Sequence, residues 1–153
     1  LFNWLQRDIA GAHCLDLFAG SGVLGLEALS RGAASLCAVE QNRAAAQRLR
    51  ENVVLLGEQG ATRVFETDAL RLLLSPPQRP FDIVFADPPF ADDVLPRVCR
   101  LLEENRWLTA DAALFLEQDS HRSWPVLPAN WTVSRTGSAG QSGHRLLRRN
   151  TPG

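Results

Sequence analysis

Short apolar runs alternate with longer segments of helical spacing over the first 117 residues of the chain. Runs typical of strands occupy residues 13–18, 35–40, 63–67, 81–86 and 112–117. Segments with apolar positions at helical spacing, or with a composition that favours helix, occupy residues 1–9, 22–31, 43–56, 69–74 and 93–105. Strands and helices that alternate in this way predict an α/β fold with a mostly parallel sheet. The run at residues 81–86 is apolar almost throughout, which is typical of a central strand covered on both faces.

The pattern changes after residue 117. Residues 131–136 and 144–149 are typical of strands, and the segment between them, residues 137–143, is rich in glycine and serine. Because so short a connection leaves no room for a crossover helix, we expect the two strands to pair antiparallel. No internal repeat is visible, and we expect one domain over residues 1–153.

Composition and charge narrow the class of protein. With 45% hydrophobic residues the chain can bury a sizeable core, and no apolar run approaches the ~20 residues that span a bilayer. All 16 basic residues are arginine and the net charge is −1, which is no signature of a nucleic-acid binder. The dense basic cluster lies near the end of the chain, at Arg145, Arg148 and Arg149. There is no methionine, so we expect a chain trimmed at its N-terminus.

Cysteine and histidine positions argue against several chemistries. The three cysteines have no paired or metal-like spacing and are expected to be free, buried thiols: Cys14, Cys37 and Cys99. None of them adjoins a proline, as the nucleophile of a pyrimidine-C5 methyltransferase usually does. The three histidines also lack the spacing of metal ligands: His13, His121 and His144. We therefore expect no metal.

A glycine-rich segment joins the first expected strand to its helix. Gly20, Gly22 and Gly25 also satisfy the dinucleotide fingerprint, so the glycines alone are only moderately specific. Asp16 distinguishes a dinucleotide site from a site for S-adenosylmethionine. A carboxylate is unfavourable beside the pyrophosphate of a dinucleotide. It can, however, lie near the cationic end of S-adenosylmethionine, directly or through water. We assign Asp16, Phe18, Gly20 and Gly22 to a cofactor site.

Two more acidic residues mark the ends of strands: Glu40 is the last residue of the second expected strand, and Asp68 comes just after the third. Glu40 can accept hydrogen bonds from both ribose hydroxyls of a nucleotide cofactor, with Gln41 beside it. Asp68, followed by Ala69, is placed to accept from an adenine amino group. Asp68 also precedes a helical segment, so an ordinary N-cap is an alternative, and both roles can hold together.

The sharpest signal is the tetrapeptide Asp87-Pro88-Pro89-Phe90, directly after the strand expected at residues 81–86. The Asp87 carboxylate and the Pro88 carbonyl can each accept one N–H of an exocyclic amine, which points its lone pair at a methyl donor. Pro89 stiffens the loop, and Phe90 can stack on a base. We assign the four residues as catalytic and also place Asp87 in the cofactor site.

The chain resembles the bacterial 16S rRNA (guanine-N2)-methyltransferases of the RsmD family. The resemblance begins at Leu1-Phe2-Asn3-Trp4-Leu5 and extends over residues 15–22, 25–33, 39–40, 68–70, 81–82 and 87–90, thinning after residue 117. The long stretch at residues 16–33 is far more specific than the glycine pattern alone.

The resemblance implies a Rossmann-like class I fold, with a seven-stranded sheet ending in an antiparallel strand pair. It implies methyl transfer from S-adenosyl-L-methionine, giving S-adenosyl-L-homocysteine, to the N2 amine of a guanine in 16S rRNA or in a small-subunit assembly intermediate. It further implies a cytoplasmic protein with a basic extension before Leu1, which would account for the weak basic signature of this chain. We expect a monomer.

Three alternatives stay open. Similar loops of an acid or amide, two prolines and an aromatic residue serve adenine-N6 and protein-glutamine methylation, and only the resemblance favours guanine. An NAD-dependent oxidoreductase would leave Asp16 and the Asp-Pro-Pro-Phe loop without a task. A non-catalytic RNA- or cofactor-binding module would leave Asp87 unexplained.

Overall fold

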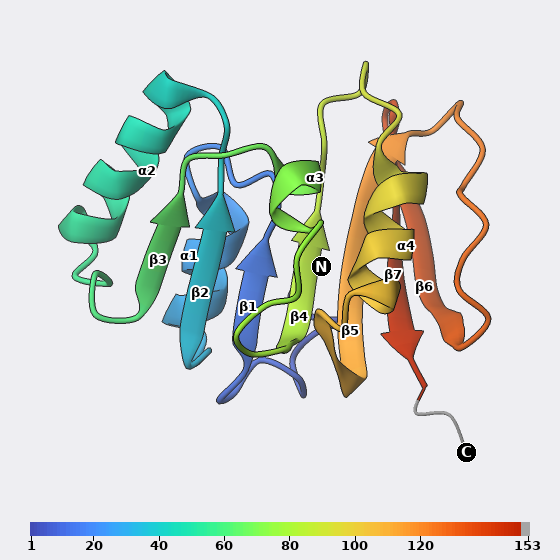
Figure 1. Cartoon of the computed structure of the whole chain (residues 1–153), viewed down its shortest axis with the longest axis horizontal. Helices are drawn as coiled ribbons and strands as arrows, with labels where there is room; N and C mark the ends of the chain where they lie inside the picture. Colours follow the sequence, from blue (N-terminus) through green and yellow to red (C-terminus); the bar gives the residue numbers. More distant parts are fainter. Residues whose placement is uncertain (151–153) are drawn as a thin grey trace.

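A computed structural model describes residues 1–150, so the last three residues of the expected domain lie outside the described part. Seven strands form one sheet in the order β3-β2-β1-β4-β5-β7-β6, with helices on both faces (Figure 1). The strands are β1 (His13–Asp16), β2 (Ser35–Val39), β3 (Thr62–Phe65), β4 (Phe81–Ala86), β5 (Leu108–Asp119), β6 (Trp131–Ala139) and β7 (Ser142–Arg149).

The pairing confirms the predicted sheet. Strands β3, β2, β1, β4 and β5 are parallel, whereas β7 runs antiparallel to β5, and β6 antiparallel to β7. The connection expected at residues 137–143 is wrong in extent, because the two last strands continue into it and leave only residues 140 and 141 as the turn. Gly137 lies inside the ladder opposite His144, where an added Cβ would stand 2.8 Å from His144 Nε2. Close packing at residue 137 therefore accounts for one of the glycines that suggested a loop.

The helices agree in number with the prediction except at the N-terminus. They are α1 (Val23–Ser30), α2 (Arg43–Leu55), α3 (Ala69–Leu72) and α4 (Leu95–Glu104). The lead-in helix expected at residues 1–9 is instead a series of turns, held by hydrogen bonds such as Asp8 N–H to the Leu5 carbonyl, 2.8 Å. Leu5 and Ile9 are nevertheless buried, so the helical spacing of apolar residues correctly indicated burial, although no helix forms.

Two apolar layers cover the sheet (Figure 1). Helices α1 and α2 and the lead-in turns pack on one face, where Leu26, Leu49 and Leu5 meet Phe85 and Phe115. Helices α3 and α4 pack on the other face. Among residues 1–150, no helix is long and apolar enough to cross a membrane.

Candidate functional site

The order of the strands determines where a ligand can bind. The chain runs outward from β1 through β2 to β3, and then returns to the other side of β1 to form β4 and β5 (Figure 1). Strands β1 and β4 are therefore the neighbours between which the chain changes direction. In open α/β sheets such a switch point opens a crevice outside the carboxyl ends of the strands, where ligands bind. The glycine loop follows β1 and the Asp-Pro-Pro-Phe loop follows β4, so both predicted loops lie at the switch point.

The glycine loop is held by its neighbours. The Gly20 N–H donates to Glu40 Oε1, 2.9 Å, and the other Glu40 oxygen accepts from the Asn42 N–H, 2.7 Å. From α2, the Asn52 side-chain amide donates to the Ser21 carbonyl, 2.9 Å. The structure thus brings Gly20 and Glu40 together, as expected of residues that share one cofactor site, and it fixes the Glu40 carboxylate at the rim of the crevice.

Asp16 points inward under this loop. It is only 2% exposed, and its carboxylate accepts a hydrogen bond from the Phe18 N–H, 3.3 Å. Burial, together with the negative charges of Asp87 and Glu40, raises the pKa of Asp16 to about 7. Asp16 therefore holds the start of the glycine loop through its hydrogen bond with the Phe18 N–H. A direct contact between Asp16 and a cofactor remains a prediction.

Asp68 caps α3. Its side chain accepts a hydrogen bond from the Leu70 N–H, 3.1 Å, so the N-cap role is confirmed. The adenine contact remains a prediction, which the exposed position of Asp68 allows. Gln41 is also exposed, whereas Ala69 is buried as the first residue of α3.

The predicted catalytic loop begins where β4 ends, at Ala86. Pro88 is buried and Pro89 is exposed, while Phe90 is 38% exposed and free to receive a flat ligand. A turn follows, closed by the Asp92 N–H and the Pro89 carbonyl at 2.9 Å. The loop thus presents an aromatic side chain on a backbone that two prolines restrict.

Residues beyond the predicted set complete the site. Glu117 lies near the end of β5, one residue after Leu116, which pairs with Ala86, so that Glu117 and Asp87 are neighbours across the two strands. Burial and, next, the charge of Glu117 raise the pKa of Asp87 to about 7. Arg122 donates to the Asp92 carbonyl, 2.9 Å, and its own carbonyl accepts from buried Gln118, 3.0 Å, so the catalytic loop is braced from the segment after β5. Glu117 could have been found from the sequence, because it is the last residue of an expected strand, as Glu40 is.

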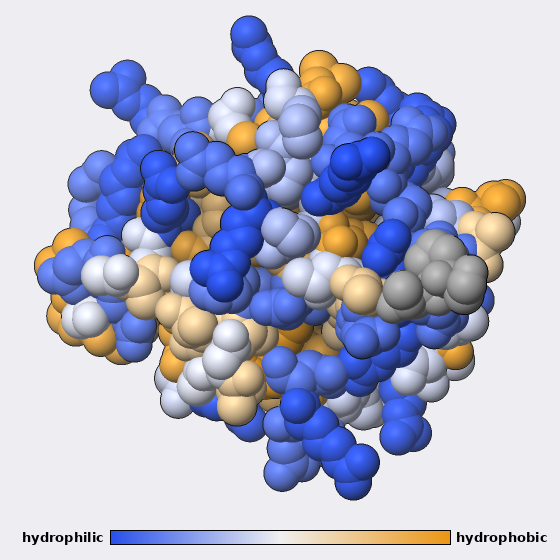
Figure 2. Space-filling model, turned by 60° about the horizontal axis from the view of Figure 1, so that its bottom comes forward, coloured by the Kyte–Doolittle hydropathy of each residue, from blue (hydrophilic) through white to orange (hydrophobic). Residues whose placement is uncertain are grey.

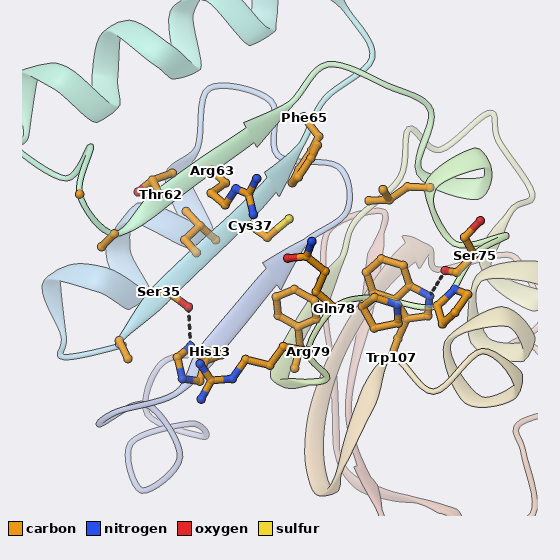
Figure 3. A pocket seen from close by; sticks show the side chains of 18 of the residues that line it. His13, Ser35, Cys37, Thr62, Arg63, Phe65, Ser75, Gln78, Arg79 and Trp107 are labelled. Atoms are coloured by element: carbon orange, nitrogen blue, oxygen red, sulfur yellow. Dashed lines mark hydrogen bonds between the residues drawn. The ribbon is translucent and has the colours of Figure 1, made fainter.

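A separate hollow of about 700 Å³ lies toward the amino-terminal ends of the strands. Figure 2 looks toward these ends and shows apolar atoms in openings between hydrophilic side chains. In Figure 3 its lining includes His13, Ser35, Arg63, Arg79 and Trp107. None of the predicted site residues lines this hollow, so it is distinct from the crevice at the switch point.

The C-terminal arginines serve the fold. Arg148 forms a bidentate pair with Asp8 at 2.6 and 2.7 Å, which ties the lead-in turns to β7. Arg149 pairs with Glu103 of α4 at 2.8 and 3.0 Å. Arg145 lies over the Trp124 ring, 4.6 Å from its centroid. Two of the three basic residues are therefore neutralised within the chain.

The cysteines are free, as predicted: Cys14 and Cys99 are buried and Cys37 is half-buried. Burial raises the pKa of each thiol to about 12, so none is a ready nucleophile. Within residues 1–150, no group of three or more potential ligands could hold a metal ion.

The comparisons with known proteins agree with this architecture. The family described as "Conserved hypothetical protein 95" matches residues 1–148. The ribosomal RNA small subunit methyltransferase D of Escherichia coli (strain K12) is 44% identical over 153 residues, covering 100% of this chain and 76% of the relative. The Haemophilus influenzae protein of the same name is 38% identical over 150 residues, covering 95% and 76%.

Solved structures extend the likeness to the fold. The structure of the yhhF protein of Escherichia coli superposes with a TM-score of 0.93 at 43% identity and covers 99% of this chain and 84% of that chain. An RNA methyltransferase from Salinibacter ruber in complex with S-adenosyl-L-homocysteine has a TM-score of 0.72 at 15% identity, covering 97% and 88%. The latter likeness concerns the fold alone, which is the Rossmann-like fold of class I methyltransferases.

Proposed function

Because this chain belongs to the family of the ribosomal RNA small subunit methyltransferase D proteins, we propose that it methylates small-subunit ribosomal RNA with S-adenosyl-L-methionine as donor. The acceptor in this proposal is the exocyclic N2 amine of a guanine in 16S rRNA, either free or in an assembling small subunit.

One observation carries the proposal: the Asp87 loop and the glycine loop follow neighbouring parallel strands at the switch point. Strands β1 and β4 are hydrogen-bonded neighbours, with Asp16 paired to Phe85, so both loops leave the sheet at the same level. A methyl donor held at one loop and a base held at the other would meet between them. An NAD-dependent oxidoreductase would need no such second loop.

The residues of the first loop fit the donor. Gly20 has φ +56°, and an added Cβ would meet no atom within 4 Å, so a ligand can approach this side of the backbone. Glu40 offers carboxylate oxygens at the position that suits ribose hydroxyls, and Asp68 offers one toward an adenine amino group. Buried Asp16 acts through its charge and by holding the loop.

The residues of the second loop fit the acceptor. A nucleobase amine is a weak nucleophile because its lone pair is delocalised into the ring. Asp87 and the Pro88 carbonyl each accept one N–H and thereby turn the lone pair toward the donor, while Phe90 stacks on the base. S-adenosylmethionine supplies a methyl group on a positively charged sulfur. Transfer would form the N–C bond as the S–C bond breaks, with the S–C electron pair staying on sulfur and one amine proton passing to solvent.

The cofactor class is tested by calorimetric titration of the protein with S-adenosyl-L-homocysteine, with NAD as the control. Binding of S-adenosyl-L-homocysteine without binding of NAD supports the proposal, and binding of NAD alone refutes it.

The reaction is tested by transfer of a labelled methyl group to unmodified small-subunit RNA, followed by digestion to nucleosides. Asp87→Ala should lower transfer by at least ~100-fold with an unchanged affinity for S-adenosyl-L-homocysteine. Asp111→Ala, at the exposed start of β5, is the matched control and should retain full transfer. Label on adenine-N6, or on a protein glutamine instead of RNA, would identify one of the alternative acceptors.

A further inference from the structure

Two carboxyl groups, not one, stand where the acceptor base must lie. Ala86 of β4 pairs with Leu116 of β5 in a parallel ladder, so Asp87 and Glu117 occupy equivalent positions one residue further along. Neighbouring strands lie ~4.8 Å apart, which brings side chains at such positions within contact. Burial and, next, the nearby charge of Glu117 raise the pKa of Asp87, as expected of two carboxyl groups this close together.

Both groups are directed to the same face of the sheet. Phe85 and Phe115 are paired and both pack in the apolar layer of α1 and α2. Since side chains alternate along a strand, Glu117, two residues after Phe115, points to this face as well. Asp87 follows Phe85 by two residues in the same way, so the same alternation directs it to this side.

Glu117 is held on a rigid element. It pairs with His144 across the β5–β7 ladder, and the His144 ring lies 6.0 Å from the Phe115 ring and 5.7 Å from the Trp4 ring, centroid to centroid. A side chain fixed on a paired strand is a more accurate recognition group than one on a loop. Glu117 forms no salt bridge with any described basic residue.

Two adjacent acceptors match one nucleobase edge. On its Watson–Crick edge guanine presents the N2 amine and the N1–H side by side, both as donors. Adenine and cytosine place an acceptor nitrogen beside their exocyclic amine instead. Ionised carboxylates only accept hydrogen bonds, and such charge-assisted bonds are short and strong.

We propose that Glu117 selects guanine by accepting its N1–H while Asp87 accepts one N–H of the N2 amine. This inference rests on the proposed function and assigns its base specificity to one residue. If adenine were bound instead, the Glu117 carboxylate would face the N1 lone pair. The carboxylate would then lose its hydrogen bonds to water without gaining a donor in their place. A site built to hydrogen-bond a substrate group rejects analogues that lack it by up to ~10⁴-fold.

The test uses a synthetic RNA fragment that spans the nucleotide methylated by the wild-type protein. One form carries guanine at that nucleotide, and the other carries 2-aminopurine, which keeps the 2-amine but has an acceptor at N1. The measured quantity is the ratio of kcat/KM for guanine to kcat/KM for 2-aminopurine. The wild-type ratio should be at least ~100.

Glu117→Gln should bring this ratio close to one, because an amide can either accept from a ring N–H or donate to a ring nitrogen. Glu117→Ala should also lower the ratio, through loss of the guanine rate. Asp111→Asn, which makes the same carboxylate-to-amide change on β5 away from the site, should keep the wild-type ratio. Affinity for S-adenosyl-L-homocysteine should be equal in all variants, which also verifies that each is folded.

The possible failures are distinguishable. If the wild type methylates guanine but both Glu117 variants keep its ratio, the role of Glu117 is refuted while the proposed function stands. If the wild type labels no guanine amine in small-subunit RNA, the proposed function and this inference both fall.

Discussion

Gly22 is the position where the structure allows the sharpest stability prediction. It is the N-cap of α1 and has φ +97°, a left-handed conformation that a side chain strains by ~1–2 kcal/mol. A Cβ at this position would also stand 2.5 Å from Leu49 Cδ1 and 2.9 Å from Leu26 Cδ1. Leu49 is fully buried on α2, so its methyl group can yield only by displacing the apolar layer beneath it.

Overpacking of this kind destabilises by ~1–3 kcal/mol, so Gly22→Ala should lower the free energy of unfolding by about 2–5 kcal/mol in total. Because the contacted atoms are the ends of leucine side chains, we expect the lower half of this range. A domain of this size is stable by ~5–15 kcal/mol, so the variant should fold. With a urea m-value of ~2 kcal/mol/M, a loss of ~3 kcal/mol lowers the denaturation midpoint by ~1.5 M at unchanged m.

Gly20→Ala is the matched control two residues away. It also has a positive φ, +56°, but an added Cβ meets nothing within 4 Å, so only the backbone strain of ~1–2 kcal/mol applies. The assay is urea denaturation followed by circular dichroism, with S-adenosyl-L-homocysteine titrated into each folded variant. Gly22→Ala should lose more stability, whereas Gly20→Ala should lose more affinity, since its methyl group enters the open side of the loop. Equal stability losses in the two variants would refute the packing argument.

The remaining predictions concern ionisation. The rate of methyl transfer should rise as the pH increases through about 7, because only ionised Asp87 accepts an N–H. Glu117→Gln should move this rise to lower pH, because it removes a neighbouring negative charge. Single-turnover rates between about pH 5 and pH 9 test both predictions. Asp16 from β1 and Glu117 from β5 are the acidic groups that act on Asp87, and His144 lies across from Glu117. Asp16 has a pKa of about 7 in the folded protein against an ordinary 3.8, so the folded protein keeps a proton that the unfolded chain releases. The free energy of unfolding should therefore fall as the pH rises from about 4 to about 7. Asp16→Asn should flatten this part of the profile in thermal unfolding, and a profile identical to that of the wild type would contradict the burial argument. Burial opposes ionisation of Glu103, but its hydrogen bonds, above all the one from Arg149, lower its pKa. Ionised Glu103 should therefore stabilise the fold above the pKa that Glu103 has in the unfolded chain, and this stabilisation should be lost as the pH falls through the lower folded pKa. Glu103→Gln should reduce this loss in acid unfolding.

The sequence predicted the elements that local patterns define. The strand at Phe81–Ala86 is found with the predicted bounds, because an unbroken apolar run between a proline-rich loop and Asp87 leaves little freedom in its ends. The N-terminal segment was predicted wrongly, since its helical spacing of apolar residues is satisfied by turns that bury Leu5 and Ile9. Periodicity reports which side chains are buried, and a short terminal segment can bury them without forming a regular helix.

The candidate site was predicted less completely than the fold, because strand order is a long-range property. Glu117 follows an apolar run just as Glu40 does, yet nothing in the local pattern places the fifth strand beside the fourth. Only the parallel pairing of Ala86 with Leu116 brings Glu117 to Asp87. Asp16 lies at the end of the first strand, as predicted, whereas its burial follows from long-range pairing, because residue 16 pairs with Phe85 and shares its inward face.

The charges at the switch point bear on the class of cofactor. Four carboxyl groups follow or end neighbouring parallel strands: Asp16, Glu40, Asp87 and Glu117. Burial and, after it, the charges of these neighbouring groups raise the pKa values of Asp16 and Asp87, so negative charge is concentrated at the switch point. A pyrophosphate would add two negative charges there, whereas S-adenosylmethionine brings a sulfonium and an ammonium group. A cationic ligand should therefore lower the pKa of both aspartates when it binds and release protons at pH 7, which calorimetry in buffers of different ionisation enthalpy detects. The neutral sulfur of S-adenosyl-L-homocysteine should release fewer protons, and equal release by the two ligands would contradict this electrostatic preference.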